Sequence, residues 1–403
     1  MPRFLLYEPS PGGHHLALHA RHIVKEALAR HWKPCLVTSE AAEGHPAFIA
    51  LRKEFGDALP VASMDRHDFP ANNVSKLNLL RFQRTQHREF ARSFSRLAGR
   101  LRPDAVYVVN LDYFDKVMAL LGSPFGRTPT VGLLMGIGFH YSRMGVVAAP
   151  KRNDWLNERL FRRLLRVRGL KSLLTIDPTL FEYCRTVGSG SFYKVRYVPD
   201  PAALKGDLSR EQARRRLGIG DGEIVVLSYG SLSPRKGVAE LMGAVHDPRC
   251  PRNVTVLLAG SQDAGIRARH GDPAWRNLIS QGRIRERDEF LDGEGEYLAF
   301  RAADIVWLGY RSFYGSSGVL YQAGLMELPV VGCREGVIGW TVGRHGLGEV
   351  VDPSDRDAVV AALARLASDA SLRRACGGRG LALARQHEAG VFGRLACDAI
   401  REA

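Results

Sequence analysis

The residues best suited to chemistry lie in one short loop in the second half of the chain. An apolar run from Ile224 to Tyr229 predicts a buried parallel strand, and apolar residues recur at helical spacing over 238–245. Between them, Gly230 to Gly237 is a glycine-bounded loop that holds Arg235 and Lys236. A strand, a glycine-rich loop and a helix together point backbone N–H groups and a helix N-terminus at an anion. The pattern favours a phosphate-bearing ligand, although an Arg-Lys pair in such a loop is often only a solvated surface pair.

A second segment has the same layout. Residues 304–308 predict a strand, and 310–318 (YRSFYGSSG) form a loop dense in glycine and serine. The helix expected at 319–326 follows, and then the strand Val330-Val331. Serine hydroxyls and N–H groups at a helix start can donate to anionic oxygens. Two such loops favour a phosphate site more strongly than one.

At these two segments the sequence resembles a known family. GSLSPRKGVAELMGAV and SSGVLYQAGLMELPVVG are similar to the two hallmark segments of the retaining group 1 (family four) glycosyltransferases, which have the GT-B fold. The resemblance is strong over about 223–345 and is limited to general layout before that. It implies that Arg235 and Lys236 are the catalytic cations, which stabilise a leaving nucleoside diphosphate. The donor-binding residues that it implies are Gly12, Gly13, Gly230, Ser231, Arg285, Tyr314, Gly315, Ser316, Ser317, Gly318, Val319 and Gln322.

The chain departs from this family at two positions. Alignment on Pro329 places Tyr314 and Gln322 where the family has glutamates that contact the donor sugar and ribose. The resemblance therefore implies that Gln322 makes a neutral contact to the ribose. A carboxylate accepts stronger hydrogen bonds than an amide, so we expect Gln322→Glu to be tolerated or to raise donor affinity.

The N-terminal segment opens as a βαβ unit with a glycine-rich turn. The expected strand at 3–8 is followed by PSPGGHH, which includes the acceptor or sugar-binding candidates His14 and His15. A third candidate, His140, follows the strand expected at 130–135. A histidine at a helix start is also often a plain cap or surface residue. The dinucleotide pattern G-x-G-x-x-G is absent from this turn.

Composition limits the class of protein. A chain of 403 residues with 45% hydrophobic residues predicts a globular protein of two or three domains. It has neither a long apolar run nor a signal peptide pattern. The six cysteines are scattered singly, which predicts reduced core thiols in a cytoplasmic protein and no structural zinc.

The net charge of +15 predicts an anionic environment, although an arginine-rich composition can also reflect a GC-rich genome. Two basic amphipathic helices are expected at 76–102 and 154–171, the first with an arginine at every third or fourth position. Either these arginines are simply solvated, or they face an anionic membrane on the inner side of the plasma membrane. No nucleic-acid motif accompanies the charge, so no nucleic-acid partner is expected.

We therefore expect an α/β protein with the GT-B fold, in which two Rossmann-like doubly wound domains face each other across a cleft. The expected divisions are an acceptor domain at 1–200, a nucleotide-sugar domain at 201–385, and a last helix at 386–403 that crosses back to the first domain. The expected activity is retaining, metal-independent transfer of a sugar from a nucleotide-diphosphate sugar to a lipid-linked acceptor or cell-surface glycan precursor, without a cofactor. Two alternatives stay open: a catalytically lapsed sugar-nucleotide binder and a nucleotide-sugar epimerase of the same fold.

Overall fold

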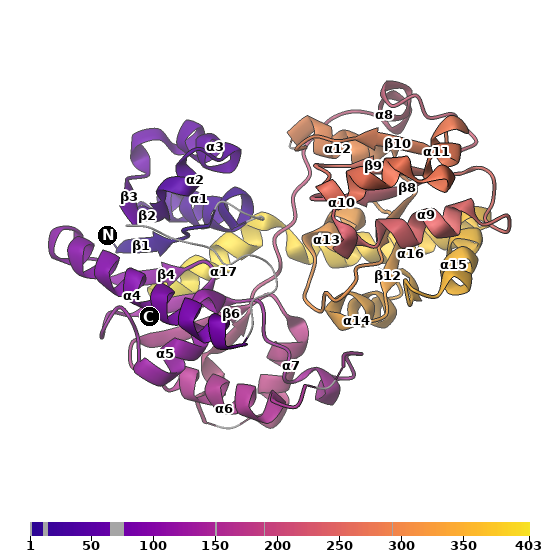
Figure 1. Ribbon diagram of the computed structural model, residues 1–403. Helices are drawn as coiled ribbons and strands as arrows, with labels where there is room; N and C mark the ends of the chain where they lie inside the picture. Colours follow the sequence, from indigo (N-terminus) through magenta and orange to yellow (C-terminus); the bar gives the residue numbers. More distant parts are fainter. Residues whose placement is uncertain (1, 11–14, 65–75, 150, 189, 292) are drawn as a thin grey trace. The chain divides into compact units, whose positions relative to one another are not determined.

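The computed structural model describes residues 2–10, 15–64, 76–149, 151–188, 190–291 and 293–403, and it divides into two compact units (Figure 1). The first unit comprises Met1–Met144, Ala149–Pro201 and Glu388–Ala403, and the second comprises Gly145–Ala148 and Ala202–His387. The chain thus passes to the second unit after Pro201 and returns to the first at Glu388. The expected Gly12, Gly13 and His14 lie outside the described residues.

The first unit is built on a seven-stranded parallel sheet with the order β3-β2-β1-β4-β5-β6-β7. Its strands are β1 (Arg3–Tyr7), β2 (Lys33–Ser39), β3 (Val61–Met64), β4 (Ala105–Val108), β5 (Thr130–Leu134), β6 (Leu170–Thr175) and β7 (Val195–Tyr197). The order reverses between β1 and β4, which is the topological switch point where doubly wound sheets bind ligands.

Helices cover both faces of this sheet. They are α1 (Arg21–Ala29), α2 (Glu40–Glu43), α3 (Pro46–Phe55), α4 (Lys76–Leu101), α5 (Asp115–Leu121), α6 (Asp154–Leu165), α7 (Pro178–Val187) and α17 (Ala389–Arg401). Residues of β1 alternate between two hydrophobic cores, with Tyr7 facing α4 to α7 and Leu6 facing α1, α3 and α17. The C-terminal helix α17 therefore completes the core of the first unit (Figure 1). Its Phe392 packs edge-on against His19.

The two basic helices differ from expectation in length. Helix α4 runs over nearly the whole predicted segment, and its six arginines are exposed: Arg81, Arg84, Arg88, Arg92, Arg96 and Arg100. The helix predicted at 154–171 is wrong at its C-terminal end, because α6 stops at Leu165 and Leu170 already begins β6. Gly169 has a φ of 90°, a left-handed conformation that a helix cannot contain. Lys171 is consequently a strand residue rather than part of a basic helix face.

The second unit has a six-stranded parallel sheet with the order β10-β9-β8-β11-β12-β13. Its strands are β8 (Ile224–Tyr229), β9 (Val254–Ala259), β10 (Ile284–Arg287), β11 (Ile305–Leu308), β12 (Val330–Cys333) and β13 (Gly348–Val351). Its helices are α8 (Arg210–Arg216), α9 (Val238–His246), α10 (Ala264–Arg267), α11 (Pro273–Ser280), α12 (Gly293–Ala302), α13 (Gly318–Leu325), α14 (Gly336–His345), α15 (Arg356–Ser368) and α16 (Ala370–Ala384). The switch point lies between β8 and β11, which are the strands that precede the two predicted phosphate loops.

The side chains of all six cysteines are buried free thiols, as the scattered spacing predicts. Among the described residues, no helix is both long enough and apolar enough to cross a membrane.

Candidate active site

The loop after β8 is shaped by its contact with the neighbouring strand β11. It contains a 3-10 turn at Pro234–Lys236 and then Gly237, whose φ of 66° is left-handed. A Cβ atom at Gly237 would overlap the carbonyl oxygen of Gly309, so only glycine fits there. The backbone N–H of Arg311 also donates to Arg235 O at 2.8 Å. These contacts join the loop to the residues that follow β11.

Lys236 is buried beneath this loop, with 6% of its surface exposed. Its Nζ donates to Tyr229 O at 2.9 Å and to the Tyr310 hydroxyl at 2.6 Å. The Tyr310 hydroxyl lies 3.5 Å from Ser317 Oγ in the second loop. An ammonium has three N–H donors, and no described residue accepts a hydrogen bond from the third. Lys236 therefore places a positive charge between the two loops.

Arg235 lies above Lys236 and is exposed. Its guanidinium carbon is 5.0 Å from the ring centre of Phe313 and 5.5 Å from that of Tyr310, so both rings of the second loop support it. An exposed guanidinium can bind two oxygens of one phosphate, whereas Lys236 acts as a fixed point charge. The structure thus brings together the two predicted cations and the second loop.

The second loop leads into the N-terminus of α13, which begins at Gly318. Ser317 is buried at this end, and Ser316, Gly315 and Gly318 are half-buried. The predicted residue Val319 is buried in the core of the second unit. Gly230 and the exposed Ser231 lie at the end of β8, on the same edge of the sheet. The predicted donor residues Gly230, Ser231 and 315–319 therefore lie together at the switch point of the second sheet.

Gln322, which stands where the family has a glutamate, contacts a glutamate from another helix. Its Nε2 donates to Glu296 Oε1 at 2.7 Å, and the Tyr229 hydroxyl donates to the same oxygen at 2.7 Å. Gln322 is 2% exposed, and its Oε1 has no partner among the described residues. A carboxylate thus reaches this position from the first turn of α12. This contact reverses the expectation for Gln322→Glu, because a second carboxylate beside Glu296 would repel it.

Tyr314 stands at the other departure from the family, and it too contacts a glutamate. Burial and a hydrogen bond to the Glu335 carboxylate both raise the pKa of its phenol. Glu335 immediately precedes α14, and the backbone carbonyl of Tyr314 accepts a hydrogen bond from Val337 N at 2.9 Å. Neither Glu296 nor Glu335 lies in a recognisable motif, so the sequence alone does not point to them.

Arg285 is a correction to the predicted donor site. Its guanidinium makes a two-point ion pair with Glu223, at 2.7 and 2.9 Å, and also donates to Gly218 O at 2.9 Å. Glu223 precedes β8, so these partners lie at the amino end of the sheet. The Arg285 side chain is therefore held away from the two loops, which lie at the carboxyl end.

In the first unit, a buried carboxylate and a histidine lie at the carboxyl end of β1. Glu8 is 0% exposed, and its Oε1 accepts hydrogen bonds from Tyr113 Oη at 2.9 Å and from Ser10 N at 2.8 Å. The Nδ1 atom of His15 lies 3.1 Å from Glu8 Oε2. His15 is also the first residue of a π-helix, His15–Ala20, which leads into α1. Single π-helical turns often occur at functional sites.

The environment of His15 is acidic. Burial by itself lowers the pKa of His15, but the charges of Glu8, Asp112 and Asp200 raise it above its ordinary value. Asp112 also accepts hydrogen bonds from Met135 N and Gly136 N at 3.0 to 3.1 Å, which ties the loop after β5 to the switch point. The predicted candidate His15 therefore lies in a cluster of carboxylates at this edge.

His140 has a different environment from His15. It is 0% exposed, and its Nε2 lies 2.9 Å from Thr179 Oγ1 and 3.3 Å from Asp177 Oδ2. Asp177 caps α7 by accepting from Thr179 N and Leu180 N. His140 thus supports a helix start in the core of the first unit, which corrects its prediction as a ligand-binding residue. Among the described residues, no group of three or more His, Cys, Asp or Glu side chains is arranged to hold a metal ion.

Comparisons with known proteins bear on both units. Residues 209–381 match the family model of glycosyl transferases group 1. A D-inositol 3-phosphate glycosyltransferase of Corynebacterium efficiens is 31% identical over 176 residues, which cover 41% of this chain and 40% of that protein. The match thus spans about two fifths of that relative.

Solved structures match over the whole chain. Sucrose-phosphate synthase from Thermosynechococcus elongatus has a TM-score of 0.72 at 16% identity and covers 100% of this chain and 99% of its own. Anabaena Alr3699/HepE, solved in complex with UDP, has a TM-score of 0.68 at 17% identity and covers 100% of both chains. The predicted GT-B fold is confirmed, and the match of residues 209–381 to the glycosyl transferases group 1 agrees with the family that the sequence resembles.

Proposed function

We propose that this protein transfers a sugar from a nucleotide-diphosphate sugar to an acceptor hydroxyl, with retention at the anomeric carbon and without a metal ion. The observation that carries the proposal is the Lys236–Tyr310–Ser317 contact, which joins two loops rich in N–H and hydroxyl donors at one switch point. Arg235 extends this cluster toward solvent. The Anabaena protein, similar in fold, was solved with UDP, which supports a nucleotide diphosphate as the ligand class.

The chemistry follows from where charge develops. As the bond between the anomeric carbon and the diphosphate oxygen breaks, the leaving nucleoside diphosphate gains negative charge. Lys236 is already held in place by two hydrogen bonds, so its charge stabilises the leaving group without reorganisation. Arg235 and the N–H groups at the start of α13 supply further donors. The acceptor oxygen forms the new glycosidic bond, and its proton leaves with the diphosphate.

For the acceptor we propose a hydroxyl group that carries no anionic charge close to it. The switch point of the first sheet holds Glu8, Asp112 and Asp200 around His15. These carboxylates would repel a phosphate but can accept hydrogen bonds from sugar or polyol hydroxyls. The name of the Corynebacterium relative indicates a phosphorylated acceptor. The two proteins would therefore differ in whether the acceptor carries a phosphate.

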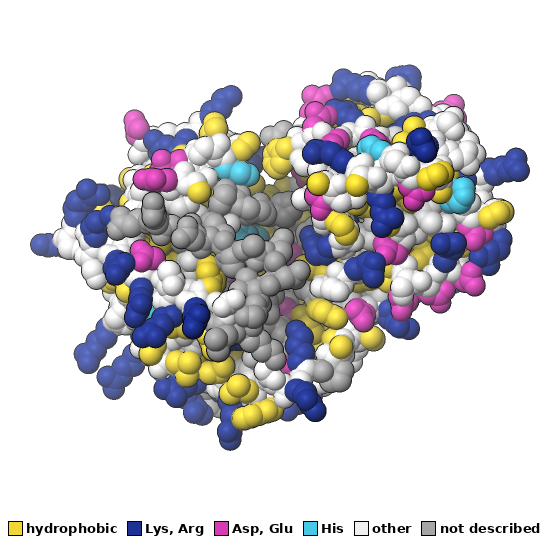
Figure 2. All heavy atoms as spheres, in the orientation of Figure 1, with side chains coloured by type: hydrophobic (Ala, Val, Ile, Leu, Met, Phe, Trp, Pro, Cys, Tyr) yellow, Lys and Arg dark blue, Asp and Glu magenta, His cyan; other side chains and the backbone are white. Residues whose placement is uncertain are grey.

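We also propose that the first unit attaches to an anionic membrane on the cytoplasmic side, where a lipid-linked acceptor or glycan precursor would be presented. Helices α5 and α6 carry four exposed apolar side chains, namely Leu120, Leu121, Trp155 and Leu156. Exposed arginines, among them Arg159 and Arg163, lie on α6 with them. Trp155 is 60% exposed, and the guanidinium of Arg159 lies 5.5 Å from its ring centre. Figure 2 shows hydrophobic and basic side chains gathered over the part of the first unit where α4, α5 and α6 lie in Figure 1. Apolar anchors ringed by cations suit the interface of an anionic bilayer.

Two experiments test these proposals. In a thermal-shift screen with UDP, GDP and ADP, one nucleotide should raise the melting temperature, and Arg235→Ala should reduce that shift. Release of that nucleotide from its sugar, dependent on an added acceptor, would distinguish a transferase from a lapsed binder. Release without an acceptor would favour an epimerase or a hydrolase. Failure of all three nucleotides to bind would overturn the donor site itself.

A further inference from the structure

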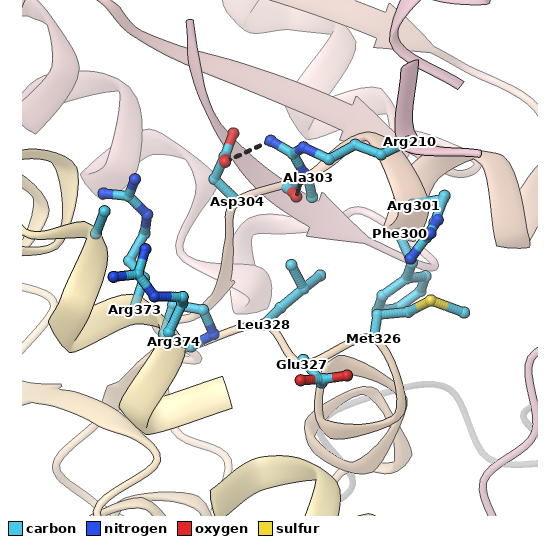
Figure 3. Close-up of a pocket in the computed structure, with 12 residues that line it drawn as sticks. Arg210, Phe300, Arg301, Ala303, Asp304, Met326, Glu327, Leu328, Arg373 and Arg374 are labelled. Carbon is cyan, nitrogen blue, oxygen red and sulfur yellow. Dashed lines mark hydrogen bonds and ion pairs between the residues drawn. The ribbon is translucent and has the colours of Figure 1, made fainter. Parts of the chain in front are cut away.

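A basic hollow lies at the opposite edge of the second sheet from the two loops. It has a volume of about 220 Å³, and its lining includes Asp304 and Pro329, which directly precede β11 and β12. The candidate donor site is at the carboxyl ends of these strands, so the hollow is a separate site. Four arginines line it: Arg210, Arg301, Arg373 and Arg374. Figure 3 shows Arg373 and Arg374 on one side of the hollow and Arg301 on the other.

Two of these arginines are fixed by hydrogen bonds to the protein. Arg210 donates to Ala303 O and to Asp304 Oδ1, each at 2.6 Å. Arg373 donates to Ala367 O at 2.9 Å and so binds the C-terminal end of α15. Their guanidinium groups hold their positions in the wall without any ligand, so these two parts of the wall are preorganised.

The other two arginines have no hydrogen-bond acceptor among the described residues. Arg374 is exposed at the rim. The Nε atom of Arg301 is buried and makes no hydrogen bond to a described residue, although Glu211 lies near enough to interact electrostatically. A buried N–H of a charged group without an acceptor is unfavourable, because water has been removed and nothing replaces it. An anion in the hollow would supply the missing acceptor.

The carboxylates nearby do not neutralise these two arginines. Asp304 is occupied, since it accepts from Arg210, from Arg214 at 3.1 Å and from Val225 N at 2.9 Å. Glu327 is exposed at the rim. Four arginines therefore line the hollow against two lining carboxylates, of which Asp304 is already saturated, while Glu211 interacts with Arg301 from outside the lining.

Helix α16 adds positive potential to the same hollow. Ala370 is the first residue of this 15-residue helix and lines the hollow, together with Arg373 in the first turn. The N-terminus of a helix carries partial positive charge, which Asp369 offsets in part here, because its side chain accepts a hydrogen bond from Leu372 N at 2.8 Å. The remaining N–H groups of this helix start and the arginines both favour an anionic ligand.

We propose that this hollow binds a phosphoryl group of a small ligand, at a site distinct from the donor site. The planar guanidinium groups of Arg301 and Arg374 would bind separate phosphoryl oxygens. Arg210 and Arg373 would keep the electrostatic potential in the hollow positive. The volume of about 220 Å³ suits a phosphate monoester or pyrophosphate.

Calorimetric titration with inorganic pyrophosphate tests this proposal. Pyrophosphate can also bind the donor site, so the titration is done with the parent protein and with Arg235→Gln, which weakens the donor site and leaves the hollow unchanged. Saturable binding should persist in both proteins. The double variant Arg301→Gln/Arg374→Gln should bind pyrophosphate about tenfold more weakly or not at all, because each lost charge-assisted hydrogen bond is substantial.

The matched control is Arg287→Gln. It removes one positive charge from the same unit, but Arg287 is paired with Glu289 outside the hollow. Its affinity for pyrophosphate should equal that of the parent protein. Equal affinity in the double variant, or loss of binding in Arg235→Gln, would overturn the proposal. Binding that weakens equally in Arg287→Gln would show a general charge effect and would also overturn it.

Discussion

Exchanging the side chains of Glu296 and Gln322 tests one hypothesis about the second phosphate loop. The hypothesis is that Glu296 of α12 supplies the carboxylate that the family supplies from the position of Gln322. The perturbation uses three variants: Glu296→Gln, Gln322→Glu and the double exchange. Glu296→Gln keeps the side-chain shape, and the two amides can reorient so that the Tyr229 hydroxyl still has an acceptor. It is therefore a change of charge with little change in packing.

Gln322→Glu should be strongly destabilising at pH 8. Its new oxygen would occupy the place of Nε2, 2.7 Å from Glu296 Oε1. Two unit charges about 4 Å apart repel by about 4 kcal/mol at an effective dielectric constant of 20. The pair would lower this repulsion by sharing one proton, so one of the two carboxyl pKa values should be raised. We expect a loss of about 2 to 4 kcal/mol in the free energy of unfolding at pH 8, most of it recovered at pH 5.

The assays are urea denaturation at the two pH values and calorimetry with the nucleoside diphosphate that binds best. Glu296→Gln should weaken nucleotide binding about tenfold, because hydrogen bonds from ribose hydroxyls to a carboxylate are stronger than those to an amide. The double exchange restores a single carboxylate, and it should return both stability and affinity to near the parent values. The reasoning is refuted if Gln322→Glu is as stable as the parent at pH 8. It is also refuted if the double exchange binds nucleotide no better than the weaker single variant.

Four further predictions follow from the structure. Arg235→Ala should lower kcat about 100-fold with an unchanged melting temperature, whereas Lys236→Ala should also lose about 1 to 3 kcal/mol of stability because Tyr310 and Tyr229 O lose a buried partner; unchanged kcat in both would contradict the assignment. Gly237→Ala should lower the melting temperature, since its Cβ would overlap Gly309 O, and a stable variant would show that the loop can shift. Burial, with a smaller effect from Asp115, raises the pKa of Asp112 to about 6. The unfolding free energy should therefore fall by up to about 3 kcal/mol as pH rises from 4 to 6, because the unfolded chain loses this proton first. Denaturation curves of Asp112→Asn should lack this dependence of the unfolding free energy on pH. The parent protein should sediment with phosphatidylglycerol vesicles and release at high salt, whereas Trp155→Ala should bind less and Phe290→Ala, exposed on the second unit, should bind equally; equal sedimentation with neutral vesicles would leave the arginines merely solvated.

Local features of the sequence determined much of the second unit. The strands before both loops are continuous apolar runs because they are buried on both faces, and such runs are visible without any tertiary information. The glycines and cations between each run and the following helix pointed to Arg235, Lys236 and 316–318. This periodic signal placed the strands and loops, whereas the expectation of two doubly wound sheets, now confirmed, came from the family resemblance.

The sequence was less informative where a pattern continued across a boundary. The apolar spacing of α6 runs on into β6, since leucine serves equally in a helix and in a buried strand, and only the conformation of Gly169 separates the two elements. Arg285 was predicted as a donor-binding residue because the family resemblance implied it. The direction of its side chain depends on Glu223, which is 62 residues away in the chain.

Tertiary structure alone decided which groups meet at the candidate sites. Lys236 finds the Tyr310 hydroxyl 74 residues away because β8 and β11 are neighbours at the switch point, and strand order cannot be read from local periodicity. Glu296 likewise reaches Gln322, 26 residues away, and Glu8 reaches the Tyr113 hydroxyl, 105 residues away. The sequence by itself determined the secondary elements, the loops and the kinds of charge in them. Long-range packing decided which of those charges are paired, buried or left to bind a ligand, because burial and pairing depend on neighbours that the chain supplies only once it has folded.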